Sequence, residues 1–403
     1  MKPDFPACRD ALTPSSLRAA RPCTARFRTP GARKRLPRQL YSYIHNGADD
    51  ERSLAGNRSA FDDYSLVPRM LTGVSGRSQA IELFGQTYAS PFGISPVGLG
   101  AMYAYRGDLV LTGQARAAGI PAVLSGSSLI PMETVAQAAP GTWFQAYMPG
   151  DPARVEALLA RIERAGFGTL VLTVDLPVMV NPENYLRNGF STPLRPSLRL
   201  AWDGLSRPRW LLGTFGRTLL RHGMPHFENW RAERGAPIVS ATVQRDFLAR
   251  DHLDWSHFRL IRQAWKGPLI VKGLMRWQDA QIARDAGVDG IVVSNHGGRQ
   301  IDGAVAPLRV LPEICRAVPE LPVMMDGGVR RGSDVLKALS LGARCVFAGR
   351  PFNYAAAVAG EAGVAHAIRI LRDEIDRNMA LMGINRLDEL DATLVRHIDS
   401  FRP

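Results

Sequence analysis

Between residues 90 and 350, the sequence alternates between short apolar runs and longer segments rich in alanine and arginine. The apolar runs have the length and composition of buried strands. Eight of them occur, at residues 92–98, 121–126, 142–147, 169–175, 268–273, 289–295, 322–328 and 345–350. Helices are predicted between most of them, as at 151–165, 277–286 and 332–341. This order predicts an α/β fold, a (β/α)8 TIM barrel, because the competing doubly wound sheet rarely has so many units in series.

Polar residues or glycines stand at the end of each apolar run. In a barrel, the carboxyl ends of the strands and the loops that follow them build the active site. A single residue of this kind is more often a cap or a turn, but a set that recurs in phase predicts a site at this end. The residues concerned are Pro96, Val97, Gly98, Ser125, Gln145, Tyr147, Thr173, Asp175, Lys272, Ser294, His296, Asp326, Gly327, Gly328, Gly349 and Arg350.

The sixth run leads into the heptapeptide Ser-Asn-His-Gly-Gly-Arg-Gln at residues 294–300. His296 can exchange a proton near neutral pH. Arg299 can bind a carboxylate through two parallel hydrogen bonds. A base and an anion clamp on one loop suggest chemistry on a small acid. Seen alone, the segment is equally compatible with a loop histidine and a solvated arginine.

The loops after the seventh and eighth runs predict an anion site. Residues 326–332 read Asp-Gly-Gly-Val-Arg-Arg-Gly, and residues 349–351 read Gly-Arg-Pro. Glycines let backbone N–H groups approach an anion, while Arg330 and Arg350 supply positive charge. We therefore expect a phosphorylated cofactor here, the alternative being ordinary tight turns.

The net charge of +13 belongs to two segments of the chain. Residues 1–40 hold ten Lys or Arg against two Asp, and residues 191–235 hold eight Arg against three acidic residues, so the remainder is neutral. No nucleic-acid motif accompanies this charge, and no nucleic-acid partner is expected. No apolar run approaches the ~20 residues of a spanning helix, which argues against an integral membrane protein. The cysteines show no metal-ligand spacing, which fits a reducing cytosol: Cys8, Cys23, Cys315 and Cys345.

Four parts are predicted along the chain. Residues 1–30 form a basic leader, expected to be disordered, although a targeting peptide or a mis-assigned start is an alternative. The barrel domain spans 31–390 and begins with a helical stretch that ends near Asn46 and Gly47, a helix C-cap signal. Residues 391–403 form a C-terminal tail. Over ninety residues separate the fourth run from the fifth, and their centre is an insert at 190–245.

The insert mixes aromatic residues and leucines with arginines, and it has almost no acidic residues between 194 and 230. This composition is typical of a segment lying in an anionic membrane interface. A basic lid or an oligomer contact packed on the barrel is the alternative, and the sequence does not choose between the two.

Taken together, these motifs resemble a known family, the FMN-dependent α-hydroxy acid oxidising enzymes. The resemblance rests on residues 294–300, on Leu-Thr-Val-Asp at 172–175, on Val-Lys-Gly at 271–273 and on the two anion-site loops. It runs from about residue 36 to about residue 388. Residues 207–210 and 221–225 of the insert are most similar to the membrane-associated mandelate dehydrogenase branch.

The resemblance implies FMN as cofactor and the oxidation of an (S)-2-hydroxy acid to a 2-oxo acid. Aryl substrates such as mandelate are favoured over lactate or glycolate. The electron acceptor would be oxygen or a membrane quinone. The protein is expected to be cytoplasmic and a homotetramer, and residues 195–230 are the candidate for a peripheral contact with the inner face of the membrane.

The same resemblance implies roles for the residues. His296 would be the base, oriented by Asp175, and Arg299 would bind the substrate carboxylate with help from Tyr43 and Tyr147. Lys272 would lie at the flavin edge where negative charge develops. The cofactor would also be bound by Pro96, Val97, Gly98, Ser125, Gln145, Thr173, Ser294, Asp326, Gly327, Gly328, Arg330, Gly349 and Arg350.

Three positions depart from the family pattern. Pro182 stands where the family has an arginine that helps to bind substrate, and Arg187 is the nearby candidate to replace it. Val97 replaces a threonine beside the flavin. Gly126 and Ser127 stand where short-chain oxidases carry a bulky aromatic residue, which leaves room for a larger substrate. The alternatives are another FMN-dependent barrel enzyme, such as an isomerase, and a weakly active or degenerate FMN-binding protein, which Pro182 would favour.

Overall fold

The computed structural model describes residues 30–401, apart from 148, 179–182, 190–196 and 241–249. Except for Pro30, the predicted leader lies outside these residues, as do Pro182 and parts of the insert.

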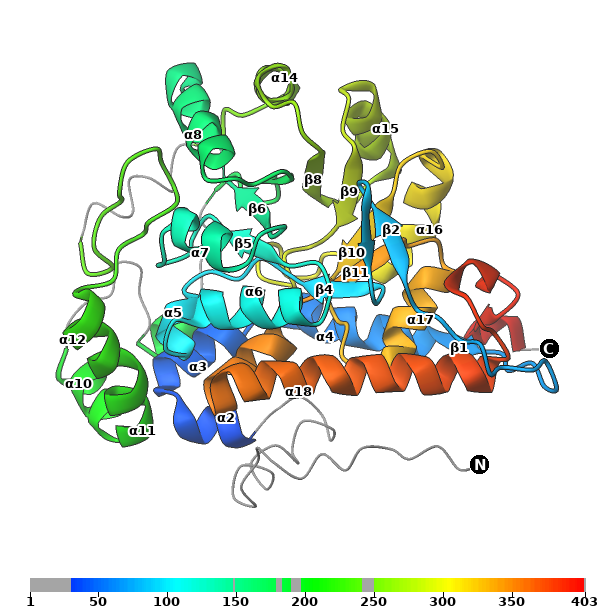
Figure 1. Ribbon diagram of the computed structural model, residues 1–403, viewed down its shortest axis with the longest axis horizontal. Coiled ribbons are helices and arrows are strands. Elements are labelled where there is room, and N and C mark those ends of the chain that lie inside the picture. Colours follow the sequence, from blue (N-terminus) through cyan, green and yellow to red (C-terminus); the bar gives the residue numbers. More distant parts are fainter. Residues whose placement is uncertain (1–29, 148, 179–182, 190–196, 241–249, 402–403) are drawn as a thin grey trace.

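Eight parallel strands form the predicted TIM barrel (Figure 1). They are hydrogen-bonded in sequence order from β5 to β11, and β11 pairs with β4. A parallel bridge between Ile94 and Ala122 closes the ring between β4 and β5. Seven strands lie within their predicted runs, and β8 extends one residue beyond its run. The strands are β4 (Phe92–Ile94), β5 (Val123–Ser125), β6 (Trp143–Ala146), β7 (Leu170–Thr173), β8 (Leu269–Leu274), β9 (Gly290–Val293), β10 (Val323–Asp326) and β11 (Cys345–Ala348).

Helices surround the barrel, and α8 (Pro152–Arg164) shows why they form. The side chain of Asp151 accepts a hydrogen bond from the Arg154 N–H, and Pro152 occupies the first turn. The buried residues Val155, Leu158, Leu159 and Ile162 follow helical spacing and pack toward the strands. The other outer helices are α6 (Gly107–Ala117), α7 (Met132–Ala138), α14 (Trp255–Ala264), α15 (Trp277–Asp285), α16 (Pro307–Ala317), α17 (Gly332–Ser340) and α18 (Arg350–Met382). Nowhere in the described part of the chain is a helix long and apolar enough to cross a membrane.

A β-hairpin closes one end of the barrel interior. It consists of β2 (Ile81–Leu83) and β3 (Gln86–Tyr88). Ile81, Leu83 and Tyr88 pack in one apolar cluster with the inward residues of seven strands, β5 to β11. The Trp143 ring N–H donates to the Tyr88 hydroxyl at 3.0 Å. Because the hairpin covers this end, the predicted active site can open only at the opposite end, where the strands finish.

The chain segments outside the barrel repeat pack against its helices. The N-terminal part holds α2 (Pro30–Arg35), α3 (Arg38–His45), α4 (Arg52–Ser59) and a 3-10 turn, Ala60–Asp63. Part of the predicted tail forms β12 (Val395–His397), which pairs with β1 (Tyr64–Leu66). The short α5 (Gly100–Tyr103) follows β4, and 3-10 turns lie at Leu387–Glu389 and Ile398–Phe401.

Helix α3 ends at the position that the sequence predicts, but the residue that ends it does not adopt the left-handed conformation of a typical C-cap. Asn46 is extended, with φ −76° and ψ 157°. The chain instead turns toward the heptapeptide loop, where the Ala48 N–H donates to the Gly298 carbonyl at 2.9 Å. A Cβ at Gly47 would lie 2.7 Å from that carbonyl oxygen. Gly47 is therefore needed for a close backbone approach.

The insert packs as a cluster of short helices at one end of the molecule (Figure 1). Trp210 anchors it, because the buried ring donates to the Met102 carbonyl at 2.8 Å and stacks on Phe215. Five large apolar side chains nevertheless remain exposed by 61% to 92%: Leu198, Trp202, Leu205, Leu212 and Leu220, which we call the insert patch. The described elements of the insert are α10 (Leu198–Leu205), α11 (Pro208–Trp210), a π-helix (Leu211–Gly216) and α12 (Arg217–His222), and α9 (Glu183–Arg187) precedes it.

The close packing of β4 yields a stability prediction. A Cβ at Gly93 would lie 2.5 Å from the Pro121 carbonyl oxygen and 2.7 Å from the Phe347 ring. Gly93→Ala should lower the free energy of unfolding by about 2–3 kcal/mol, because a close-packed strand must shift. The matched control is Gly56→Ala in α4, where a Cβ meets nothing within 4 Å. This substitution should raise the free energy by about 0.5–1 kcal/mol. Urea unfolding of both variants measures the difference, and equal effects would contradict the packing argument.

Candidate active site

One cavity at the carboxyl ends of the strands collects nearly all the predicted site residues. Three of them do not line it but contact residues that do: Gln145 contacts Ser125, Asp175 contacts His296, and Ser294 contacts Lys272. The lining residues predicted from sequence are Tyr43, Pro96, Val97, Gly98, Ser125, Tyr147, Thr173, Lys272, His296, Arg299, Asp326, Gly327, Gly328, Arg330, Gly349 and Arg350.

His296 is held by a carboxylate from a strand two positions away in the barrel. Its Nδ1 lies 2.8 Å from Oδ1 of Asp175, which follows β7. A proton on Nδ1 would be donated to Asp175 and leave Nε2 as the basic nitrogen. His296 also has φ 56°, a left-handed conformation that is uncommon for a non-glycine residue. Its backbone N–H donates to the Ser294 hydroxyl at 3.0 Å, which supports that turn.

Lys272 lies at the centre of a buried charge cluster. Its Nζ is 3.3 Å from Oδ2 of Asp326 and 3.9 Å from Oδ2 of Asp175. It also donates to the Ser294 hydroxyl at 2.7 Å. Burial alone would lower the pKa of Lys272, but Asp326 and Asp175 outweigh it, and the pKa is raised. The lysine is therefore a fixed cation beneath the cavity.

The same cluster keeps Asp175 ionised. Burial alone would raise the pKa of its carboxyl, but His296 and Lys272 outweigh burial, and the pKa is lowered. A buried carboxylate that stays charged at neutral pH stabilises a protonated imidazole beside it. The pair can therefore take up a proton from a substrate and hold the resulting positive charge.

Arg299 and Tyr43 lie together on another side of the cavity. The guanidinium of Arg299 lies 5.2 Å from the centre of the Tyr43 ring and donates to the Ile44 carbonyl at 2.8 Å. Since Tyr43 belongs to α3, the N-terminal helix contributes to the site.

An arginine that no sequence motif indicated, Arg250, lies against the ring of Tyr147. The guanidinium of Arg250 lies 4.6 Å from the centre of the Tyr147 ring, and Arg250 is only 9% exposed. Arg187, the expected replacement for the missing family arginine, is exposed and forms an ion pair with Glu183 at 2.9 Å. Arg187 is therefore not part of the cavity, whereas Arg250 is buried behind one of its tyrosines.

Buried polar atoms around the cavity suit a bound cofactor. Gln145 Nε2, Thr173 Oγ1 and Asp326 Oδ1 are buried and have no hydrogen-bond partner among the described residues. Such groups are rare in folded proteins unless a ligand or water satisfies them. Their mixture of donors and acceptors fits the polar edge and the hydroxyl chain of a flavin nucleotide.

The backbone of the predicted anion site can also come close to a bound anion. Gly327 and Gly328 have φ 101° and 80°, and a Cβ at Gly328 would lie 2.0 Å from the Asn57 carbonyl oxygen. Helix α18 begins here at Arg350 without a side-chain cap, so its N-terminal dipole faces the cavity. The half-buried Arg330 adds charge, although burial lowers the pKa of its guanidinium.

Arg350 has a structural function that the sequence did not predict. Its guanidinium donates to the carbonyls of Ile44, Gly297 and Asn46 at 3.0, 2.9 and 3.1 Å. It thereby ties the start of α18 to the end of α3 and to the heptapeptide loop. The side chain lines the cavity, but these contacts direct its N–H groups toward backbone oxygens.

Sequence reasoning also missed several polar side chains of the cavity. Asn353 lies in the first turn of α18, and its buried Oδ1 has no partner in the described part of the structure. Ser95 lies 3.5 Å from Asp326, and the Tyr103 hydroxyl donates to the Gly98 carbonyl. Trp230, an insert residue, donates its ring N–H to the hydroxyl of Ser127, a position that the sequence had already marked beside the substrate. No motif marks the other positions, because packing alone directs them to the cavity.

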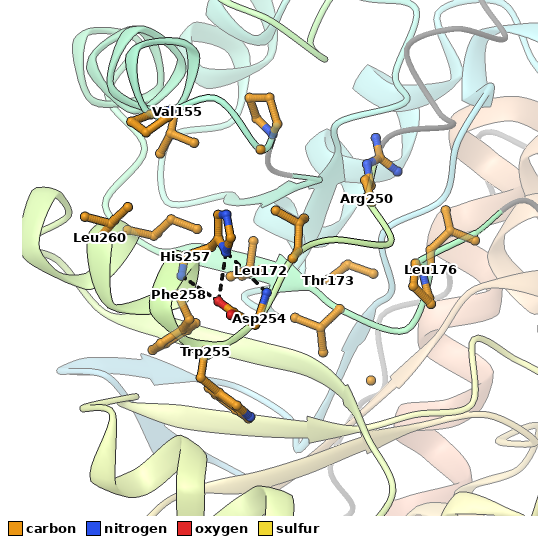
Figure 2. A pocket seen from close by; sticks show the side chains of 18 of the residues that line it. Val155, Leu172, Thr173, Leu176, Arg250, Asp254, Trp255, His257, Phe258 and Leu260 are labelled. Atoms are coloured by element: carbon orange, nitrogen blue, oxygen red, sulfur yellow. Dashed lines mark hydrogen bonds and ion pairs between the residues drawn. The ribbon is translucent and has the colours of Figure 1, made fainter.

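A larger cavity of about 610 Å³ lies between α8 and α14, beside the end of β7 (Figure 2). Its walls are mostly apolar side chains such as Val155, Leu172 and Phe258. Thr173 lines both cavities, and Arg250 lies on the side away from α14. The smaller cavity is lined by His296, Lys272 and Arg299 and by the unsatisfied atoms of Thr173 and Asp326, so it is the candidate active site.

The fold and this cavity define a class of protein. A TIM barrel with a histidine–carboxylate pair, a buried lysine, an arginine and a glycine-lined anion site is an enzyme that combines a phosphate-bearing cofactor with a small acid. Comparison with known proteins agrees. The sequence matches the FMN-dependent dehydrogenase family over residues 32–397, and the chain belongs to this family.

Individual relatives are similar over nearly their whole length. An L-lactate dehydrogenase of Caulobacter sp. (strain K31) is 40% identical over 379 residues, which are 91% of this chain and 97% of the relative. The (S)-mandelate dehydrogenase of Pseudomonas putida is 37% identical over 351 residues, covering 87% and 88% of the two chains. The crystal structure of a monotopic membrane protein, (S)-mandelate dehydrogenase, has a TM-score of 0.83 and 35% identity, covering 91% of this chain and 96% of that one.

These relationships establish the general activity. The protein is an FMN-dependent 2-hydroxy acid dehydrogenase, with FMN as its cofactor. When bound, FMN accepts the two electrons that leave the substrate. The unsatisfied atoms of Gln145, Thr173 and Asp326 and the glycine-lined loops fit this cofactor.

The buried charge cluster yields a pH-dependent stability prediction. Lys272→Met keeps the side chain long but leaves two carboxylates without their cation. At about pH 7 the free energy of unfolding should fall by about 3 kcal/mol. Lys272 lowers the pKa of Asp175, so without it this pKa rises. In the variant, the folded state is destabilised by the ionised form of Asp175, which is fully populated only at pH values above this raised pKa. The loss of unfolding free energy should therefore become smaller as the pH falls toward about 5 and Asp175 is protonated.

Chemical unfolding of the parent and the variant at both pH values measures this change. The exposed Lys266→Met variant controls for loss of a lysine in general. A deficit of equal size at both pH values would contradict the electrostatic account.

Proposed function

We propose that the protein oxidises an (S)-2-hydroxy acid to the 2-oxo acid, with His296 as the base. The observation that carries this proposal is the 2.8 Å contact between His296 Nδ1 and Asp175, with Arg299 lining the same cavity. His296 would take a proton from the α-carbon or the hydroxyl of the substrate through Nε2. Asp175 would orient the ring and stabilise its protonated form.

The remaining residues bind and orient the substrate. Arg299 would bind the carboxylate, and Tyr43 and Tyr147 would donate hydrogen bonds to the carboxylate or the hydroxyl oxygen. Lys272 would stabilise negative charge at the flavin edge. Ser125, Gln145, Thr173 and Ser294, with the backbone of residues 96–98, would hold the ring system.

The phosphate-bearing chain of FMN would occupy the far side of the cavity. Asp326 would accept hydrogen bonds from ribityl hydroxyls. Gly327, Gly328 and Gly349, with Arg330, Arg350 and the start of α18, would surround the phosphate.

Aryl substrates are favoured by the side of the cavity near Ser127. Gly126 and Ser127 leave no bulky side chain there, and the Trp230 ring stacks on Phe227 at 4.1 Å behind Ser127. The space that Gly126 and Ser127 leave would accept the aromatic ring of an aryl substrate. Similar proteins act on mandelate or on lactate by name, so an aryl preference goes beyond their common activity.

Anaerobic titration of the purified yellow protein tests the reaction. We expect (S)-mandelate to bleach the flavin absorbance faster than (S)-lactate does, because burial of the phenyl ring in the space beside Gly126 and Ser127 adds binding energy. Readmitting oxygen then distinguishes the acceptor, since rapid return of colour indicates an oxidase. No bleaching by any 2-hydroxy acid would contradict the proposal and support a degenerate FMN-binding protein.

The insert patch supports a peripheral membrane location, and such a location would give the reduced flavin access to a membrane quinone as electron acceptor. It presents Trp202 and four leucines to solvent, beside the exposed Arg209, Arg217 and Arg221. Exposed apolar residues rimmed by arginines favour the interface of an anionic membrane. A lid or an oligomer contact would use the same surface, and a direct test distinguishes such a contact from membrane binding.

Flotation with vesicles of phosphatidylglycerol and phosphatidylcholine provides that test. The parent should float with the vesicles, and Trp202→Glu combined with Leu212→Glu should weaken binding by about tenfold or more, because charge replaces buried apolar surface. Leu381→Glu is the matched control, since Leu381 is 65% exposed in the last turn of α18, a helix that runs away from the insert helices toward β1 (Figure 1). A parent that stays in solution, as an oligomer that the double variant dissociates, would contradict the membrane proposal.

A further inference from the structure

Arg250 is a buried cation beside the active site that no sequence motif indicated. It precedes α14, and its carbonyl accepts a hydrogen bond from the Leu253 N–H at 3.1 Å. The next residue, Asp254, caps α14 in a capping box with His257. This turn and capped helix hold the backbone of Arg250 in place. A buried arginine in a fixed position is costly, so its location calls for a function.

Two of the tyrosines that line the cavity, Tyr43 and Tyr147, each have an arginine against the ring. Arg299 lies 5.2 Å from the ring centre of Tyr43, and Arg250 lies 4.6 Å from that of Tyr147. Arg299 lines the active-site cavity, whereas Arg250 lies behind Tyr147 and lines the neighbouring cavity of Figure 2. Arg250 therefore reaches the substrate space only through the tyrosine.

A cation at this position changes what the phenol can do. Burial raises the pKa of Tyr147, and Asp175 and Tyr43 raise it further, while Arg250 and Arg299 lower it. Burial lowers the pKa of Arg250, and Tyr147 opposes that shift. Arg250 thus favours release of the phenol proton of Tyr147, and Tyr147 favours the charged form of Arg250. A phenol next to a cation is a stronger hydrogen-bond donor to a negatively charged oxygen.

We propose that Arg250 supplies, beside Arg299, the second guanidinium charge on the substrate side of the active site, which the family obtains from an arginine at the position of Pro182. It is a positioning residue: it stacks on Tyr147, fixes the ring and strengthens the hydroxyl as a donor to the anionic oxygen of the substrate. Arg187 does not serve this purpose, because it is exposed and paired with Glu183. The inference rests on the proposed 2-hydroxy acid substrate.

The test compares Arg250→Met, Arg250→Lys and Arg187→Met in the FMN-loaded protein. Methionine preserves much of the apolar packing and removes the charge, and lysine restores the charge. Binding of benzoylformate, the 2-oxo acid of mandelate, is measured by the change in the flavin spectrum. The neutral methyl ester of benzoylformate serves as the uncharged probe. Anaerobic reduction by (S)-mandelate is measured in parallel.

Arg250→Met should bind benzoylformate about tenfold more weakly. It should also reduce the flavin about 10- to 100-fold more slowly at saturating mandelate. Binding of the methyl ester should change little, Arg250→Lys should recover part of the loss, and Arg187→Met should match the parent. In a Tyr147→Phe background, which keeps the ring but removes the hydroxyl, Arg250→Met should have a much smaller effect.

Three results would overturn the inference. The first is unchanged benzoylformate binding by Arg250→Met. The second is an equal loss for the acid and its ester, which indicates a packing role. The third is an undiminished effect in the Tyr147→Phe background, which means that Arg250 does not act through the tyrosine. If the parent binds benzoylformate but no 2-hydroxy acid reduces its flavin, the proposed function fails, while the binding measurements still decide the function of Arg250.

Discussion

The buried ion cluster around Lys272 is the interaction on which the active site depends. Lys272 stands beside Thr173 in the β7–β8 register, within 4 Å of both Asp175 and Asp326. Charges at this depth are stable only as a set, because each one offsets the desolvation of its partners. The cation keeps Asp175 ionised, and the ionised Asp175 in turn orients His296. The barrel makes the cluster possible, since neighbouring parallel strands end at the same edge and point alternate residues inward.

A second set of contacts completes the substrate side from distant parts of the chain. Arg350 binds three carbonyls, and two of these belong to the end of α3. Arg299 binds the Ile44 carbonyl there as well, and Ala48 pairs with Gly298. The end of α3 is thereby held against the heptapeptide loop and the start of α18. Tyr43 reaches the cavity because of this arrangement, so arginines that look like ligands for anions also serve as structural ties between elements.

Much of the fold could be predicted because each barrel strand is a separate apolar run, and the polar residues that end these runs converge by the geometry of the fold alone. The cavity therefore holds most of the predicted residues. The remainder depends on packing that no local pattern encodes. Asn46 looks like a left-handed cap but is extended, because Gly47 must approach Gly298. Arg250 is one of many arginines in a basic stretch, and only the folded chain shows that it is buried against Tyr147. Arg187 is nearer to Pro182 in sequence but faces solvent.

The central claim is that His296, held by Asp175, is the base of the reaction. Rapid-mixing measurement of anaerobic flavin reduction in His296→Gln tests it most directly, with benzoylformate binding measured on the same protein. The account predicts that the variant retains FMN and binds benzoylformate, while reduction by the 2-hydroxy acid slows by about 100- to 10,000-fold. Reduction within about tenfold of the parent rate, in a variant that still binds the 2-oxo acid, would contradict the assignment of the base.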